Sequence, residues 1–322
     1  MNRRQMIGAL AAAAWPLTAR AQQTIPVVGF LNSGSPGSID MALNAFHQGL
    51  LDTGFTEGRN FLIEARWAEG DYSRLPALAA ELIALRPAVI VANGPAVMSV
   101  KTGTATIPVV FTAGFDPIEL GLVASLSHPG GNLTGVSILN SELGPKRLEL
   151  LREAVPAVAV IALLVNPANP NAESIANNVR IRAKNWGLQV RILEANSDQG
   201  ISDAFAKFAE LKVDGLVIGN DPFFTSRGSF LAGIAFRRAV PAIAQYREFV
   251  LAGGLMSYGG SLTKAYHLAG NYTGRILKGE RPADLPVQQS TTVELAINLK
   301  TAKAFGLSIP LSLLGRADEL IE

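Results

Sequence analysis

The side chains best suited to chemistry are scarce and dispersed in this sequence. It contains no cysteine and three histidines, His47, His128 and His267. His47 and His267 fall within amphipathic helical patterns and His128 precedes a Pro-Gly-Gly turn, so we interpret all three as ordinary surface or core residues. Metal centres and thiol nucleophiles have little to be built from, and we expect no catalytic residue, no bound metal and no cofactor.

The familiar catalytic and phosphate-binding motifs are also missing. Gly34 and Gly37 follow the first expected strand, but their spacing differs from G-x-G-x-x-G, and neither a P-loop nor G-x-S-x-G occurs. Asp116 and Asp221 each stand before a proline, where Asp usually begins a turn, although two such carboxylates are also able to pair. The pattern thus favours binding over catalysis.

Five loops that begin where apolar runs end abruptly are the candidates for binding. They span residues 32–35, 93–95, 112–117, 166–170 and 220–224. Each leads into an expected helix, whose first turn exposes backbone N–H groups at the positive end of the helix dipole. The candidates for holding an anionic group are Ser33, Gly34, Gly94, Ala113 and Gly114. Ser33, Asn93 and Asp221 are also suited to capping helices.

Aromatic residues of the second half of the chain are candidates for contact with the body of a ligand. They are Phe223, Phe224, Tyr246, Phe249 and Tyr258. Phe223 and Phe224 directly follow an expected strand, so at least one should face a cleft, whereas Phe249 has the spacing of a core residue. Arg247 and Glu248, beside Tyr246, are expected to bind ligand charges, to clamp the closed protein by an ion pair, or to form a solvated surface pair.

Short β-branched runs alternate with helical patterns along the whole chain. The expected strands are 25–31, 61–67, 88–92, 109–111, 160–165, 188–193, 215–218 and 242–244, and the clearest helices are 39–51 and 75–85. This alternation is typical of parallel sheets flanked by helices, which predicts an α/β protein. About 300 residues after the N-terminal segment usually divide into two domains.

The second half of the chain repeats the first. Phe30-Leu31-Asn32 matches Leu164-Val165-Asn166 at an offset of 134 residues, and Ile107-Pro108 matches Val240-Pro241 at an offset of 133. Two further pairs, 54–55 with 187–188 and 91–95 with 218–222, keep the same order. The repeat predicts two lobes of one fold, although doubly wound proteins also produce such echoes by chance. Ligands of such sheets bind outside the carboxyl ends of the strands, here in the cleft between the lobes.

The N-terminus has the pattern of an export signal. Arg3 and Arg4 precede the apolar run 6–17, and Ala19-Arg20-Ala21 forms a small-x-small cleavage site. We expect cleavage after Ala21 and a periplasmic protein, exported by the general route or, given the arginine pair, by the twin-arginine route. Without the signal, 25 basic residues face 26 acidic ones, so nothing indicates nucleic acid or an anionic membrane as a partner. Because the sequence contains no cysteine, it has none that could carry a lipid anchor after the signal. We therefore expect no direct membrane anchor.

Several motifs, taken together and in order, resemble ABC transporter substrate-binding proteins of the tryptophan/tyrosine-uptake type. They are 32–36 (NSGSP), 55–59 (FTEGR), 64–67 (EARW), 129–136 (PGGNLTGV), 166–172 (NPANPNA), 221–224 (DPFF), 246–258 (ending in GGLMSY), 285–289 and 298–303. The likeness covers essentially the whole chain after the signal. It implies a type I periplasmic-binding fold, with two Rossmann-like, doubly wound parallel-sheet lobes joined by a three-segment hinge.

The resemblance also implies where the lobes begin and end. After the signal peptide 1–21, the first lobe comprises 22–137 and about 261–290, and the second comprises 138–260 and about 291–322. The hinges are expected near 134–140, 258–261 and 289–294, where the expected elements change lobe. The partner is an ABC transporter permease in the inner membrane, and the ligand is a small molecule, with an amino acid or aromatic acid as the first candidate.

The expected ligand-binding residues combine the strand-end loops with the positions that the resemblance implies. They are Asn32, Ser33, Gly34, Asn93, Gly94, Thr112, Ala113, Asp116 and Ser137 on the first side, and Asn166, Asn169, Asp221, Phe223, Tyr246, Arg247 and Tyr258 on the other. Two alternatives remain open at this point. One is a periplasmic enzyme with Asp116, Glu248 or Tyr246 as acid or base, and the other is a sensory protein that uses the same two-lobed clamp.

Overall fold

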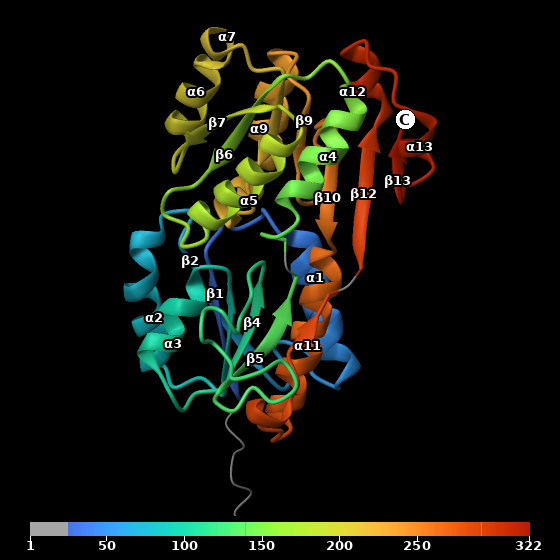
Figure 1. The fold of residues 1–322 in the computed structure, drawn as a ribbon. Coiled ribbons are helices and arrows are strands. Elements are labelled where there is room, and N and C mark those ends of the chain that lie inside the picture. Colours follow the sequence, from blue (N-terminus) through green and yellow to red (C-terminus); the bar gives the residue numbers. More distant parts are fainter. Residues whose placement is uncertain (1–24, 139, 291) are drawn as a thin grey trace, which may run out of the picture.

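The protein consists of two sheets, each flanked by helices, placed one above the other in Figure 1. The computed structural model describes residues 25–138, 140–290 and 292–322. The expected export signal, 1–21, therefore lies outside the described residues.

The first sheet has six strands, all parallel, in the order β11-β5-β4-β3-β1-β2. Its strands are β1 (Val27–Asn32), β2 (Leu62–Trp67), β3 (Val89–Asn93), β4 (Val109–Ala113), β5 (Leu133–Ser137) and β11 (Gln288–Gln289). Side chains alternate between the two faces, so Phe30 packs on one side of the sheet and Leu31 on the other. The central strands are buried on both faces, as their continuous apolar runs predict.

The second sheet has seven strands in the order β13-β12-β10-β9-β8-β6-β7. Its strands are β6 (Val160–Val165), β7 (Gln189–Glu194), β8 (Gly215–Ile218), β9 (Ala242–Ala244), β10 (Met256–Gly260), β12 (Val293–Asn298) and β13 (Glu319–Ile321). All neighbours are parallel except β10 and β12, which pair antiparallel. The sheet is thus parallel-dominated rather than wholly parallel.

The two sheets share one topology. The order β2-β1-β3-β4-β5 in the first sheet matches the order β7-β6-β8-β9-β10 in the second. The internal repeat predicted from the sequence is therefore confirmed at the level of strand order. The matched segments 30–32 and 164–166 occupy equivalent places, at the ends of β1 and β6.

Helices cover both faces of the first sheet, and we call this sheet and its helices the first lobe. On one face lie α2 (Leu75–Ala84) and α3 (Ala96–Gly103), and on the other lie α1 (Asp40–Asp52) and α11 (Leu262–Leu277). The backbones of α1 and α11 approach closely, because a Cβ atom on Gly49 would collide with the carbonyl oxygen of His267, and one on Gly270 with that of Phe46.

The second sheet and its helices form the second lobe. One face carries α4 (Gly144–Ala154) and α5 (Ala172–Asn185), and the other carries α6 (Asp198–Ala206), α7 (Phe208–Leu211), α9 (Gly228–Arg237) and α10 (Arg247–Leu251). The short helices are α8 (Pro222–Ser226), α12 (Leu299–Ala304) and α13 (Leu311–Leu314). No helix in the described part of the chain has both the length and the apolar character needed to cross a membrane.

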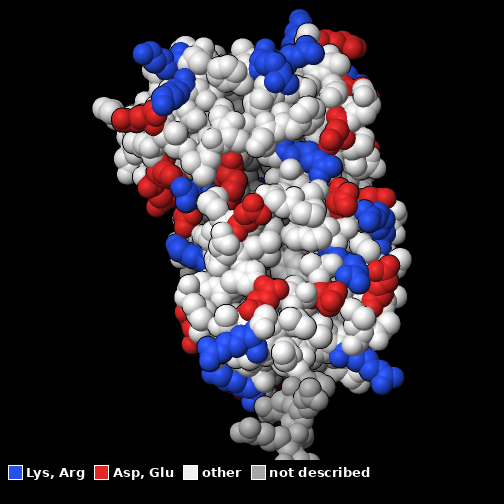
Figure 2. All heavy atoms as spheres, turned by 180° about the vertical axis from the view of Figure 1, so that it is seen from behind, with Lys and Arg blue, Asp and Glu red and all other residues white. Residues whose placement is uncertain are grey.

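The chain passes between the lobes three times, after β5, between β10 and α11, and between β11 and β12 (Figure 1). These crossings fall within the segments in which we expect the hinges. Acidic and basic side chains are interspersed on the face shown in Figure 2, which fits the nearly balanced charge of the chain without its N-terminal segment.

Candidate ligand-binding site

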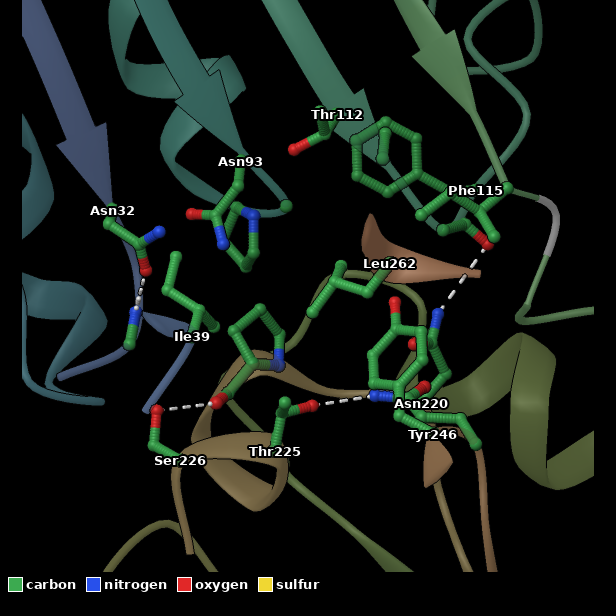
Figure 3. Close-up of a pocket in the computed structure, with 18 of the residues that line it drawn as sticks. Asn32, Ile39, Asn93, Thr112, Phe115, Asn220, Thr225, Ser226, Tyr246 and Leu262 are labelled. Carbon is green, nitrogen blue, oxygen red and sulfur yellow. Dashed lines mark hydrogen bonds between the residues drawn. The ribbon is translucent and has the colours of Figure 1, made fainter. Parts of the chain in front are cut away.

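A cavity lies between the lobes, at the carboxyl ends of strands from both sheets (Figure 3). Asn32, Asn93 and Thr112 reach it from the ends of β1, β3 and β4, while Asn220 and Tyr246 reach it from beyond β8 and β9. The cavity encloses about 610 Å³ of empty space, part of it continuous with solvent. Parallel sheets place their ligand sites at this edge, so the cavity lies where the sequence predicted a cleft.

The wall from the first lobe is held by a network of side-chain to backbone hydrogen bonds. Asn32 accepts from the Gly34 N–H at 2.7 Å through Oδ1, and Asn93 accepts from the Ser33 N–H at 2.8 Å. Ser33 is fully buried, and its Oγ accepts from the N–H of Ala96, the first residue of α3, at 3.1 Å. Ser33 therefore caps α3 from a neighbouring loop, and these loops are held together by hydrogen bonds of the protein itself.

Tyr266 of α11 also lines this wall, although its position in an amphipathic helix carried no signal in the sequence. Its hydroxyl accepts a hydrogen bond of 3.2 Å from Asn32 Nδ2. Burial raises the pKa of Tyr266 to about 12, so the phenol is neutral at physiological pH. A neutral phenol is both a donor and an acceptor.

The wall from the second lobe is built by the segments after β8 and β9. Gln245 Nε2 donates to Thr225 Oγ1 at 2.8 Å, and Thr225 Oγ1 in turn donates to the carbonyl oxygen of Asp221 at 3.0 Å. Burial raises the pKa of Tyr246 above its ordinary value, so this phenol is neutral as well. Figure 3 shows the rings of Tyr246 and Phe115 and the side chain of Leu262 close around the cavity.

One group of the expected binding residues lines the cavity and the other does not. The lining group is Asn32, Gly34, Asn93, Gly94, Thr112, Ala113, Asn169 and Tyr246. The group away from the cavity is Ser33, Asp116, Ser137, Asn166, Asp221, Phe223, Arg247 and Tyr258. Lining residues that the sequence did not suggest include Ile39, Ile138, Asn171, Thr225, Ser226, Gln245, Leu262 and Tyr266.

Two residues expected on the first side serve the local backbone instead. Asp116 Oδ1 accepts from the N–H of Ile118 at 2.7 Å, which is the turn-forming role that an Asp before proline usually has. Ser137 is fully buried, and its Oγ donates to the carbonyl oxygen of Phe115 at 3.0 Å. Both side chains are thus committed to holding the loops behind the cavity.

On the second side, Arg247 and Tyr258 are likewise engaged elsewhere. Arg247 Nη2 lies 2.7 Å from Glu319 Oε1 of β13, so its ion pair lies within the second lobe and does not clamp the two lobes together. Tyr258 packs against the core beside α4, and its carbonyl oxygen accepts from Arg147 Nε at 2.8 Å.

Phe223 and Phe224 do not wall the cavity, contrary to the expectation that at least one would. Both are 2% exposed and belong to the core of the second lobe, as Phe249 also does in agreement with its spacing. The Phe223 ring packs against the backbone of Gly70 in the first lobe, where a Cβ atom would leave only 2.6 Å to Phe223 Cδ2. Phe223 therefore forms part of the contact between lobes.

Asp221 is the centre of a second contact between lobes. Its Oδ1 accepts from the Tyr72 hydroxyl of the first lobe at 2.8 Å and from Asn166 Nδ2 at 3.1 Å, while Oδ2 accepts from Asn169 Nδ2 at 2.7 Å. Its Oδ1 also caps α8 through the N–H of Phe223. Burial raises the pKa of Asp221, and these hydrogen bonds oppose the rise.

A third contact between lobes joins the loop after β1 to the end of α8. The N–H of Ser35 donates to Ser226 Oγ at 3.1 Å, and Arg227 Nη1 donates to Ser35 Oγ at 2.9 Å. The Arg227 guanidinium also lies over the Phe223 ring, 5.0 Å from its centroid. Together these contacts close one side of the cavity, so the structure represents a closed arrangement of the lobes.

The described residues contain no cluster of three or more His, Asp or Glu side chains able to hold a metal ion. What the site offers is amide, hydroxyl and phenol groups together with apolar surface. Such a site is equipped to bind and orient a small molecule.

Comparison with known proteins agrees with this geometry. A family model described as "ABC transporter substrate binding protein" matches residues 24–321. The tyrosine-binding protein of Clostridioides difficile strain R20291 is 28% identical over 271 residues, which is 84% of this chain and 78% of that protein.

Two crystal structures share the fold throughout. A conserved domain protein from Vibrio cholerae has a TM-score of 0.84 at 26% identity, covering 92% of this chain and 100% of its own. An ABC domain from Streptococcus pneumoniae in complex with L-Trp has a TM-score of 0.82 at 26% identity, with the same coverage. The fold is that of the type I periplasmic binding proteins, and the chain belongs to the ABC transporter substrate-binding protein family.

Proposed function

We propose that this protein captures a small molecule in the cavity between its lobes, outside the inner membrane, and presents it in the closed form to an ABC permease. The observation that carries the proposal is the placement of the cavity. It is lined by strand ends of both sheets, and it is bordered by hydrogen bonds that cross from one lobe to the other. A ligand there would contact both lobes at once.

Contact with both lobes gives the ligand its effect on conformation. A ligand that binds the closed form better than the open form shifts the equilibrium towards closure by that difference in affinity. The three crossings of the chain between lobes are the proposed hinges, at 134–140, 258–261 and 289–294. The lobe boundaries that we propose are 22–137 with about 261–290, and 138–260 with about 291–322.

Export supports the same function. Residues 1–21 have the pattern of a cleaved signal, and delivery to a permease requires the protein on the outer side of the inner membrane. Family membership favours a binding protein over an enzyme, and the turn-forming role of Asp116 removes one proposed acid or base. The named ligands of the relatives, tyrosine and L-Trp, make aromatic amino acids and aromatic acids the first compounds to test.

A thermal-shift screen of residues 22–322 tests the proposal. The panel contains amino acids, aromatic acids and their amides, sugars and nucleosides. Ligand at about 100 times its Kd adds about 2.7 kcal/mol of stability and raises the melting temperature by about 4 °C. Small-angle scattering then compares the radius of gyration with and without the hit. We expect a hit that makes the protein more compact, whereas turnover of the hit into a product would contradict a pure binding role.

A further inference from the structure

The cavity contains no side chain with a formal charge among the described residues that line it. Its polar side chains carry the amides of Asn and Gln and the hydroxyls of Ser, Thr and Tyr. Both lining tyrosines, Tyr246 and Tyr266, are neutral. This is unusual for a site that would hold a free amino acid. An ammonium and a carboxylate taken out of water each require a counter-charge or a full set of hydrogen bonds.

The charged groups nearest to the cavity are already committed. Asp221 receives four hydrogen bonds, from Tyr72, Asn166, Asn169 and Phe223. Glu248 lines neighbouring cavities but not this one. No carboxylate of the described residues is therefore placed to receive a ligand ammonium.

Arg147 is buried, and it is not among the residues that line the cavity. Its guanidinium donates to the carbonyl oxygens of Asn140 and Tyr258 at 3.0 and 2.8 Å, and the residue is 1% exposed. Arg227, at the side of the cavity, is engaged with Asp198 and Ser35.

Three of the backbone N–H groups that the sequence offered for an anion are also occupied. Those of Ser33 and Gly34 donate to the side chains of Asn93 and Asn32, and that of Gly94 donates to the carbonyl oxygen of Thr112 at 3.0 Å. A ligand carboxylate would have to break these bonds to use them. The N–H groups of Ser33, Gly34 and Gly94 are thus satisfied within the protein, where a carboxylate was expected.

One neutral acceptor in the lining has no donor. Gln245 is 6% exposed, and its Oε1 is buried without a hydrogen-bond partner. In this arrangement Thr225 donates its hydroxyl proton to the Asp221 carbonyl and accepts from Gln245 Nε2, which leaves Oε1 as the amide atom without a partner. A buried acceptor without a donor is destabilising, and a donor on a ligand would remove that cost.

We propose that the cavity takes an uncharged ligand, which combines an apolar or aromatic body with an N–H or O–H donor for Gln245. The inference rests on the proposed function and narrows its ligand class. The apolar body would lie among Ile39, Phe115, Ile138 and Leu262. The ligand differs in this respect from the free amino acids named for the relatives.

Two sets of four compounds test this inference. Within each set the aromatic ring and the two-carbon chain attached to it stay the same, and the compounds differ in charge. The first set is L-tyrosine (zwitterion), tyramine (cation), 3-(4-hydroxyphenyl)propionate (anion) and 3-(4-hydroxyphenyl)propionamide (neutral). The second set is L-tryptophan, tryptamine, 3-indolepropionate and 3-indolepropionamide. D-Xylose and myo-inositol are added as uncharged polyols, and Kd values are measured by calorimetry at pH 7 with residues 22–322.

We expect the tightest binder to be uncharged, with its charged counterparts at least about tenfold weaker. A zwitterion or an ion as the tightest binder overturns the inference, as does the failure of every neutral probe to bind at about 1 mM. Either result leaves the proposed function standing if any compound in the screen binds and compacts the protein. The two ideas therefore fail separately.

Variants of Gln245 test the role of its amide oxygen. Gln245→Met keeps the size but removes the acceptor together with the Nε2 donor to Thr225, and it should weaken the best neutral probe by roughly tenfold. Gln245→Glu supplies a carboxylate, and it should raise the affinity for tyramine relative to the neutral amide. Gln189→Met, at an exposed position of β7, is the matched control and should bind like the wild type. Unchanged affinity in Gln245→Met, with an unchanged melting temperature, contradicts the assignment.

Discussion

The Tyr72 hydroxyl donates a 2.8 Å hydrogen bond to Oδ1 of Asp221, and these residues belong to different lobes. The bond is partly buried, and it is made to a buried carboxylate that is held by two asparagines of its own lobe. Charge-assisted hydrogen bonds of this kind are stronger than neutral ones. The pair therefore stabilises the closed arrangement, and it does so beside the cavity without occupying it.

Tyr72→Phe should weaken closure. The closed form loses a hydrogen bond to a charged group, about 1.5–3 kcal/mol, whereas Tyr72 would be hydrated in an open form. Ligand affinity should fall by roughly tenfold or more, measured by calorimetry with the compound found in the screen. Tyr272→Phe is the matched control, because the Tyr272 hydroxyl donates to the Pro286 carbonyl within the first lobe. Equal losses of affinity in both variants would contradict a specific role in closure.

Asp221→Asn should change the pH dependence of stability. Burial raises the pKa of Asp221 in the folded protein above 3.8, so the folded state binds its proton more tightly than the unfolded state. The stabilisation from this proton is present below pH 3.8 and is lost as the pH rises through the raised pKa. The unfolding free energy of the wild type minus that of the variant should therefore decline with pH above 3.8. Urea unfolding at a series of pH values measures it, and a difference that increases with pH would show that the hydrogen bonds outweigh burial.

Gly49→Ala should destabilise the first lobe. The added Cβ would collide with the backbone of His267 in α11. A helix backbone cannot move aside as the end of a flexible side chain can. Overpacking of this kind costs about 1–3 kcal/mol. Gly228→Ala is the control, since a Cβ there meets nothing within 4 Å. It should be neutral or stabilising by up to about 1 kcal/mol. Chemical denaturation compares the two, and equal stabilities would contradict the close approach of α1 and α11.

Arg147→Met should loosen two crossings between the lobes. The Arg147 guanidinium binds the carbonyl oxygens of Asn140, in the crossing after β5, and of Tyr258, in β10 just before the second crossing. Burial lowers the pKa of Arg147 to about 10, so it remains a charged donor at neutral pH. Its loss removes the guanidinium donor from both carbonyls, although the Asn140 carbonyl keeps the Leu143 N–H at 3.3 Å, and should cost roughly 3 kcal/mol. Hydrogen exchange should accelerate around 140–143 and 258–261. Acceleration spread evenly over the protein would argue against a local role.

The strands β1–β4 and β6–β9 and their order could be predicted from the sequence, whereas β5 and β10–β13 were not expected. The run 25–31 became β1 at Val27–Asn32, and the helical pattern 39–51 became α1 at Asp40–Asp52. Apolar period and turn residues are local properties of the chain, which is why they suffice for such elements. The repeat added the two-lobed topology, since segments that match in order occupy equivalent strands. The antiparallel pairing of β12 with β10 carried no such local signal, because the period of a strand does not reveal its direction.

The residues that line the candidate site likewise include some that could be predicted from the sequence and others that could not. Asn32, Asn93 and Thr112 were predictable because the carboxyl ends of parallel strands meet at one edge of a sheet. Tyr266 and Gln245 were not, because the first lies within an amphipathic helix and the second among the apolar residues of a strand end. The direction of Phe223 was decided by Gly70, a residue of the other lobe whose missing Cβ leaves room for the ring. The sequence by itself thus determined which loops gather at the cleft. Only the tertiary structure decided which side chains turn into it, because that depends on partners far away in the chain.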